Sequence, residues 1–237
     1  KTTITAIILH VLQFHKIDCD YLVGAQLEGF DTMVKLTKDA PIAILEGDEY
    51  LSSPIDRRPK FHLYKPDIAL LSGIAWDHIN VFPTFENYVE QFDIFVNQIP
   101  GGGVLIYYEA DEEVKKICEQ VKREIRKFPY TIPEHTIENG ITYLTNSATQ
   151  KIPLQVFGDH NLLNISGARL VCNQLGVNDE QFYEAISSFK GAANRMELIG
   201  SSETTAVYKD FAHSPSKVRA TISALKDQFP GRRLVAC

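Results

Sequence analysis

The sequence predicts an α/β protein built on a mostly parallel sheet, and two short apolar runs carry this prediction. Residues Pro41–Leu45 and Ile68–Ile74 are rich in aliphatic side chains and do not alternate between polar and apolar residues. Such runs are typical of strands buried on both faces of a parallel sheet. The first run ends at Glu46, and the second is followed by Asp77 and His78. Because ligands collect at the carboxyl ends of parallel strands, we expect Glu46 and His78 to meet at one edge of the sheet.

The remaining elements alternate along the chain. Helical spacing or helix caps predict helices over Ala6–Phe14, from Thr84 through an aromatic stripe to Ile99, over Asp111–Val121, from Gly158 to Leu175, from Asn178 or Asp179 onward, and over Ser216–Gln228. Further strands are predicted at Asp20–Gly24, Val104–Tyr108, Met196–Ile199 and Thr205–Tyr208, with another beginning at Leu234–Cys237.

Between residues 125 and 157 the sequence changes to short strand-forming runs separated by turn residues, which predicts a small antiparallel sheet attached to the parallel one. Turn signals, above all Asn139-Gly140, separate short runs of strand-forming residues. These runs are Tyr130–Ile132, Ile141–Leu144 and Leu154–Phe157.

Composition limits the classes of function. The chain has 237 residues, of which 44% are hydrophobic and 23% charged, as in ordinary globular proteins. A formal charge of −6 gives no basic surface for nucleic acid. Neither a membrane-length apolar run nor a signal peptide is visible, so we expect a cytoplasmic protein. The cysteines are far apart and form no CxxC pair, which predicts reduced thiols and no zinc site; they are Cys19, Cys118, Cys172 and Cys237.

A break at Gly191–Arg195 predicts a domain boundary. We expect one domain over residues 1–194 and the beginning of a second α/β domain over residues 195–237. The chain begins at Lys1 without a methionine and stops inside a strand-like run. We therefore expect a fragment of a longer protein.

Lys1-Thr2-Thr3 at the start of the first helix resembles the end of a phosphate-binding loop. In such loops the lysine reaches the phosphates of a nucleotide, and the following hydroxyl holds Mg²⁺. The glycines of the loop are absent, and taken alone the three residues are also compatible with a simple helix cap.

Glu46 and His78 are candidate metal ligands together with Thr2. Mg²⁺ prefers hard oxygen ligands and often takes some of them from substrate phosphates. The hydroxyl of Thr2 and the carboxylate of Glu46 are ligands of this kind. His78 would be an unusual Mg²⁺ ligand, near a second ion. The alternatives are a solvated loop acid for Glu46 and an ordinary histidine at a strand end for His78.

Polar residues in the second half of the chain also allow two interpretations. Asn161 could cap a helix, or with Asn164 it could offer an amide to adenine. Arg195 and Asp210 could form an ion pair at a hinge, or Arg195 could hold a phosphate.

Six segments in order, KTTIT, EGDEY, DH, GDHNLLN, FKGAANR and DFAHSP, resemble the Mur ligases, the ADP-forming amide synthetases of peptidoglycan precursor metabolism. The resemblance implies ATP and Mg²⁺ as cofactors, a central ATP-binding domain, and no covalent enzyme nucleophile. It implies that Lys1, Thr2 and Thr3 lie at the ATP phosphates. Asn161 and Asn164 would lie at the nucleotide, and Arg195 and Asp210 would face it from the following domain. Thr2, Glu46 and His78 would hold metal ions, and Lys1, His78 and Arg195 would be the catalytic residues.

Within the family, the loop after Glu46 is most similar to the branch that joins UDP-N-acetylmuramate to the tripeptide L-alanyl-γ-D-glutamyl-meso-diaminopimelate. The alternative is the branch that adds L-alanine. Asn194 stands where the family has an arginine, and Ser214 where it has a histidine. Neither substitution removes a residue with an implied role. We expect the fragment alone to be inactive.

Other classes also fit parts of the pattern. These are a phosphate-loop nucleotide switch or transport ATPase, a non-catalytic binding domain, and a relative of folylpolyglutamate synthetase.

Overall fold

A parallel sheet of three strands lies at the centre of one part of the chain in the computed structural model, which describes residues 1–27, 29–146 and 149–237. The strands follow the order β4 (Ile68–Leu71), β5 (Val104–Tyr108) and β6 (Arg126–Tyr130), and both pairs are parallel. The predicted parallel sheet is thus confirmed. It belongs to a compact unit of Lys1 and Leu45–Thr131, called here the sheet unit. Thr2–Ile44 and Ile132–Cys237 form a second, the helical unit.

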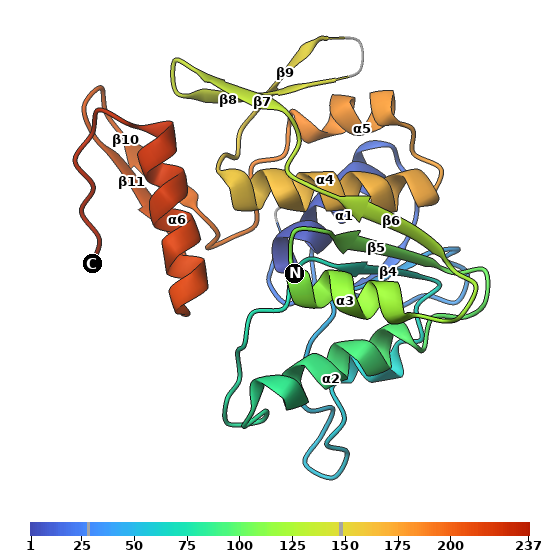
Figure 1. The fold of residues 1–237 in the computed structure, drawn as a ribbon. Coiled ribbons are helices and arrows are strands. Elements are labelled where there is room, and N and C mark those ends of the chain that lie inside the picture. Colours follow the sequence, from blue (N-terminus) through green and yellow to red (C-terminus); the bar gives the residue numbers. More distant parts are fainter. Residues whose placement is uncertain (28, 147–148) are drawn as a thin grey trace. The chain divides into compact units, whose positions relative to one another are not determined.

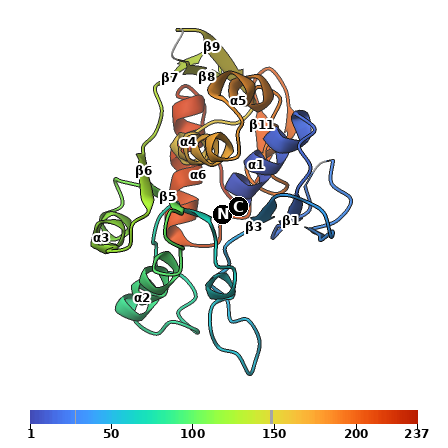
Figure 2. The same cartoon turned by 90° about the vertical axis from the view of Figure 1, so that its right-hand side faces the viewer.

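Helices α2 (Phe85–Val96) and α3 (Glu112–Gln120) pack against each other, and α3 packs on β5 (Figures 1 and 2). α2 begins after Thr84, the predicted cap, and α3 begins after Asp111, the first residue of the predicted helix. The Thr84 hydroxyl accepts a hydrogen bond from the Asn87 N–H at 3.2 Å. The Asp111 carboxylate accepts one from the Val114 N–H at 3.0 Å. Each cap satisfies an N–H group that the first turn of the helix leaves without a partner.

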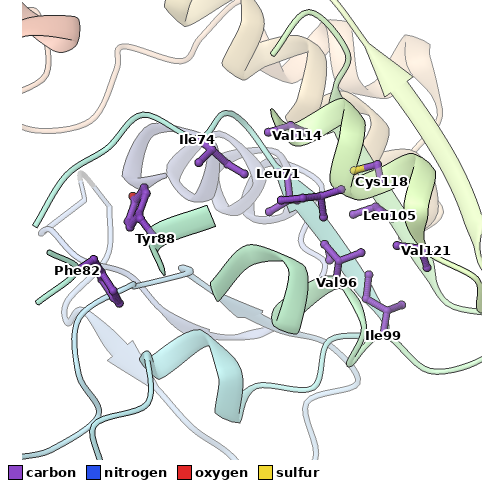
Figure 3. Packing of buried hydrophobic residues seen from close by; sticks show 12 residues of the cluster. Leu71, Ile74, Phe82, Tyr88, Val96, Ile99, Leu105, Val114, Cys118 and Val121 are labelled. Atoms are coloured by element: carbon purple, nitrogen blue, oxygen red, sulfur yellow. The ribbon is translucent and has the colours of Figure 1, made fainter. Parts of the chain in front are cut away.

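The core of the sheet unit forms where these helices meet the sheet (Figure 3). The predicted aromatic stripe of α2 contributes to it as packing. Buried members include Leu71, Ile74, Tyr88, Val96, Ile99, Leu105, Val114 and Cys118. This core fixes the loops that leave β4 and enter α2.

The strand predicted at Pro41–Leu45 is not part of that sheet. It becomes β3 (Ala43–Leu45), in a separate sheet of order β2-β1-β3 with β1 (Asp20–Leu22) and β2 (Val34–Lys35). Ala43 and Leu45 are exposed. The prediction of a strand buried on both faces was therefore wrong, because a short apolar run does not show which faces of a strand are covered.

The small antiparallel sheet is confirmed, and the run predicted at Ile141–Leu144 is one of its strands, whereas the run predicted at Leu154–Phe157 overlaps its strand only at Leu154. It consists of β7 (His135–Glu138), β8 (Ile141–Thr145) and β9 (Lys151–Leu154). Asn139 and Gly140, with φ of 52° and 75°, make the predicted tight turn between β7 and β8. The run predicted at Tyr130–Ile132 was assigned to the wrong sheet, since residues 126–130 form β6.

In the helical unit, α1 (Thr2–Phe14) packs against α4 (Asp159–Gln174) and α5 (Asp179–Ile186), as Figure 2 also shows. The predicted apolar face of α1 is buried. Gly176, with φ of 89°, follows α4 where glycine was expected to end it. Asn178 and Gln181 cap α5 reciprocally.

The last part of the helical unit contains a hairpin of β10 (Glu197–Ser201) and β11 (Ala206–Lys209), followed by α6 (Pro215–Gln228). All three elements were predicted within a few residues. The strand predicted at Leu234–Cys237 was wrong, because these residues have no regular structure.

All four cysteines are free, as predicted, and Cys237 is the exposed one. Burial raises the pKa of the Cys118 and Cys172 thiols to about 12, so these groups stay protonated and unreactive at neutral pH. Among the described residues, no helix combines the length and apolar character needed to cross a membrane.

Candidate functional site

A buried carboxylate, Glu49, collects polar side chains from separate segments of the sheet unit. Glu49 is 7% exposed. The Lys1 ammonium forms an ion pair with Glu49 Oε2. The Tyr88 hydroxyl donates a hydrogen bond to Oε1 at 3.1 Å, and His78 Nε2 lies 3.6 Å from the same oxygen. We call Lys1, Glu49, His78 and Tyr88 the Glu49 cluster.

Tyr88 reaches Glu49 from the first turn of α2. Its ring is 3% exposed and lies 5.3 Å from the Phe82 ring, centroid to centroid. Burial, and next the negative charge of Glu49, raise the pKa of the Tyr88 phenol well above its usual range. The phenol therefore stays protonated and acts as a donor to the carboxylate.

His78 is held by a tight turn after β4. Its φ of 57° lies in the left-handed region, which is sparsely populated by residues other than glycine and often marks functional sites. The His78 carbonyl accepts hydrogen bonds from the N–H groups of Val81 and Phe82, at 2.8 and 3.0 Å. Its own N–H donates to Asp77 Oδ1 at 2.8 Å, and its ring lies 4.2 Å from that of Tyr50. The backbone of His78 is therefore held by hydrogen bonds, and its imidazole ring is held by the contact with Tyr50.

The segment that carries Glu49 is fixed through its neighbour Asp48. Lys60, at the start of the 3₁₀ helix η1 (Lys60–Leu63), donates to Asp48 Oδ2 at 2.8 Å. Burial is the largest single influence on the pKa of the Asp48 carboxyl and acts to raise it. The hydrogen bonds from Lys60 and from the Tyr50 N–H, with the charges of Lys60 and Lys1, together outweigh burial and lower the pKa. Asp48 thus pairs with Lys60, while Glu49 pairs with Lys1.

The structure therefore brings two predicted residues, Lys1 and His78, onto one carboxylate that the sequence did not single out. Glu46 follows β3 directly and is partly buried. The sequence EGDEY offers several acids, and periodicity does not show which of them turns inward. The sequence holds no signal that separates Glu49 from the neighbouring acids Glu46 and Asp48.

No group of three or more His, Cys, Asp or Glu side chains is placed to hold a metal ion among residues 1–27, 29–146 and 149–237. The predicted set of Thr2, Glu46 and His78 contains two side chains of these types. It would need oxygen ligands from phosphate and water, as Mg²⁺ commonly has. The metal site stays a prediction.

In the helical unit, Thr2 is buried as the first residue of α1, and Thr3 is half-buried after it. The unpaired N–H groups at a helix N-terminus favour an anion such as phosphate. The predicted phosphate-binding residues therefore stand at a helix end with the right polarity.

Asn161 lies in the first turn of α4 and is 6% exposed. Its side-chain amide donates to the Phe157 carbonyl at 2.9 Å. The interpretation of Asn161 as the N-cap was wrong, because Gly158, with φ of 87°, occupies that position. Asn164 is half-buried on the same helix.

Arg195 and Asp210 have separate partners in the structure. The Arg195 guanidinium lies over the Phe211 ring, 4.9 Å from its centroid. The Asp210 carboxylate accepts hydrogen bonds from the Met196 N–H at 3.1 Å and from the Thr221 hydroxyl at 2.6 Å. Asp210 thereby joins the turn before β10 to α6, in place of the predicted ion pair with Arg195.

The partly buried His160, beside Asn161, predicts a loss of stability in mild acid. Burial lowers the pKa of His160 below its ordinary value of 6.5, against the opposing carboxylates of Asp210 and Asp159. The unfolded chain thus binds a proton that the folded protein resists. This contribution to the unfolding free energy is complete above pH 6.5 and is lost as the pH falls below it. Urea titrations between about pH 7.5 and 5.5 measure the decline. His160→Gln should flatten it, and an equally steep decline in H160Q would contradict the assignment.

Comparison with known proteins gives matches along most of the chain. The pattern of the Mur ligase middle domain matches residues 1–172, and that of the Mur ligase glutamate ligase domain matches residues 194–237. The chain is 28% identical to a UDP-N-acetylmuramate--L-alanyl-gamma-D-glutamyl-meso-2,6-diaminoheptandioate ligase of Haemophilus influenzae, over 98% of this chain and 52% of that protein. It is 29% identical to a UDP-N-acetylmuramate--L-alanine ligase of Sulfurihydrogenibium, over 100% of this chain and 51% of that protein.

A solved structure shares the fold. The MurF ligase of Thermotoga maritima, crystallised in complex with ADP, superposes with a TM-score of 0.73 at 20% identity, over 94% of this chain and 54% of that one. The chain spans about half the length of the curated relatives that it matches.

Proposed function

The chain belongs to the Mur ligase family, and from that membership we propose that it forms the ATP-binding part of an ADP-forming amide ligase for peptidoglycan precursors. The observation that carries the proposal is the Glu49 cluster, where the lysine of the phosphate-loop motif and the histidine of the DH motif meet on one buried carboxylate. The ADP complex of the MurF relative supports a nucleotide as ligand. We place the boundary of the ATP-binding domain at residues 194–195.

The proposed substrates are UDP-N-acetylmuramate and the tripeptide L-alanyl-γ-D-glutamyl-meso-diaminopimelate, as in the murein peptide ligases. The Haemophilus influenzae relative, which bears that activity in its name, supports this choice. The second candidate for the amino substrate is L-alanine, which the name of the 29% identical Sulfurihydrogenibium relative supports.

The proposed roles follow the local structure. Lys1 binds the phosphates by charge, next to Thr2 and Thr3 at the N-terminus of α1. Glu46 and His78, with Thr2, hold Mg²⁺, which would neutralise charge on the phosphates. Asn161 and Asn164 line the nucleotide from α4. Arg195 and Asp210 act from the beginning of the second domain.

The reaction requires crowded anions to be neutralised and aligned. A muramoyl carboxylate oxygen attacks the γ-phosphorus of ATP, and ADP leaves. The amine of the second substrate then attacks the acyl carbon and loses a proton, and phosphate departs as its bond to that carbon breaks. Charges that are already in place before the reaction lower the barrier of such steps more than any other factor.

The test measures ADP release by the full-length protein that contains this chain. We expect release only when UDP-N-acetylmuramate and the amino substrate are both present, with the tripeptide preferred to L-alanine. ADP release without co-substrates would favour the nucleotide switch or transport ATPase. Failure to bind nucleotide would favour a non-catalytic domain. The 237-residue chain alone is expected to release no phosphate under any of these conditions.

A further inference from the structure

We propose that Glu49 is a positioning residue that takes the place of the nucleotide phosphates and holds the Lys1 ammonium until they arrive. The inference rests on the proposed function, in which Lys1 binds phosphate. It adds a role for an acid that is not itself one of the proposed metal ligands, although it lies beside one of them, His78.

The two ends of the Lys1–Glu49 pair differ in burial. The Glu49 side chain is 9% exposed and that of Lys1 is 42% exposed. A lysine has a long flexible stem with a strongly hydrated head, so its ammonium can move at low cost. The carboxylate is fixed, and Lys1 is the partner that is able to leave.

Glu49 keeps partners when Lys1 leaves. Tyr88 donates to Oε1 from inside the core, and His78 Nε2 stays 3.6 Å from the same oxygen. A buried carboxylate without compensation would be costly, and the hydrogen bond from Tyr88 reduces that cost. The cluster therefore tolerates both positions of the ammonium.

The exchange has a consequence for affinity. Phosphate must displace a carboxylate that already neutralises Lys1, and the fixed negative charge of Glu49 repels the incoming anion. Glu49 therefore aligns Lys1 in the free protein and weakens the binding of a bare nucleotide. Its removal should strengthen that binding, whereas the loss of a purely structural residue would weaken it.

The experiment measures ADP affinity by titration calorimetry on the full-length protein, in EDTA so that metal does not mask the exchange. Glu49→Gln keeps the shape and the acceptor for Tyr88 but removes the charge. We expect E49Q to bind ADP about tenfold more tightly than the wild type, as for a close charge pair. Asp48→Asn is the matched control, since it removes one charge from the same segment where the partner is Lys60. It should change the affinity by less than about twofold.

A double variant identifies the partner. In a Lys1→Ala background, Glu49→Gln should give no gain, because the gain comes from releasing Lys1. If E49Q does not fold, Glu49→Asp keeps the charge but withdraws it from Lys1, and it should also tighten binding.

The outcomes separate the inference from the proposed function. Unchanged or weaker ADP binding by the folded Glu49 variant would overturn the inference, as would a gain that persists without Lys1. Either result leaves the proposed function standing if the wild type binds ADP in the presence of Mg²⁺. A wild type that binds no nucleotide with Mg²⁺ would overturn both.

Discussion

Replacing Lys1 with alanine in the full-length protein is expected to lower kcat/KM for ATP by about 10³-fold, measured as ADP release with both co-substrates present. In the proposed function, Lys1 supplies a positive charge where negative charge accumulates during phosphoryl transfer. Arginine at this position is expected to restore only part of the activity, because a planar guanidinium does not replace a compact ammonium.

Lys60→Ala provides the matched control for that loss. Lys60 also pairs with an acid of the EGDEY segment, but its partner is Asp48 and its side chain is 43% exposed. We expect ADP release within about twofold of the wild type, since exposed ion pairs contribute little. A folded K1A protein with near-normal activity would contradict the assignment of Lys1, whatever the result for K60A.

Gly103→Ala is expected to reduce the unfolding free energy by about 3 kcal/mol, as overpacking of a closed site does. Gly103 stands immediately before β5. A Cβ there would lie 2.5 Å from Ile99 Cγ2, 2.9 Å from the Pro100 carbonyl oxygen and 3.0 Å from that of Asp67. Ile99 is fully buried, and the two oxygens belong to the backbone, so none of these atoms can yield cheaply. Urea denaturation followed by circular dichroism measures the change.

Gly101 lies in the same turn and gives the comparison. Apart from its two chain neighbours, no atom of the described residues lies within 4 Å of a Cβ built on Gly101, so Gly101→Ala should be neutral or slightly stabilising. Equal midpoints for G103A and G101A would show that the backbone around β5 relaxes. The close approach at Gly103 would then contribute nothing measurable to the free energy of unfolding.

The sequence predicted those elements whose local signals agree with their surroundings. Thr84 and Asp111 cap helices because their side chains satisfy nearby N–H groups without help from the rest of the fold. The Asn139-Gly140 turn is likewise determined by residues that accept positive φ. Signals of this kind need no knowledge of distant segments.

Sheet membership depends on distant segments, and here the sequence was insufficient. Strands were predicted at Pro41–Leu45 and Tyr130–Ile132. The strands found there, β3 and β6, each joined a sheet other than the one expected. The run at β3 is apolar but largely exposed, and β6, with the sequence RKFPY, begins with two charged residues although it pairs in parallel. Which strand lies beside which is decided by long-range packing.

The candidate site was predictable to a similar degree. Motif residues such as Lys1 and His78 were found because their residue types and order resemble those of a family. Glu49 was missed, because its importance comes from burial and from three partners that only the folded chain assembles.

The division of the chain also constrains how it is made on the ribosome. The sheet unit is almost continuous, from Leu45 to Thr131, so its strands and helices can assemble as soon as that stretch has emerged. The helical unit is split, and α1 must wait for α4 and α5 while the intervening residues are translated. During this delay the apolar face of α1 is without the helices that bury it in the folded chain, and such exposed apolar surface favours aggregation.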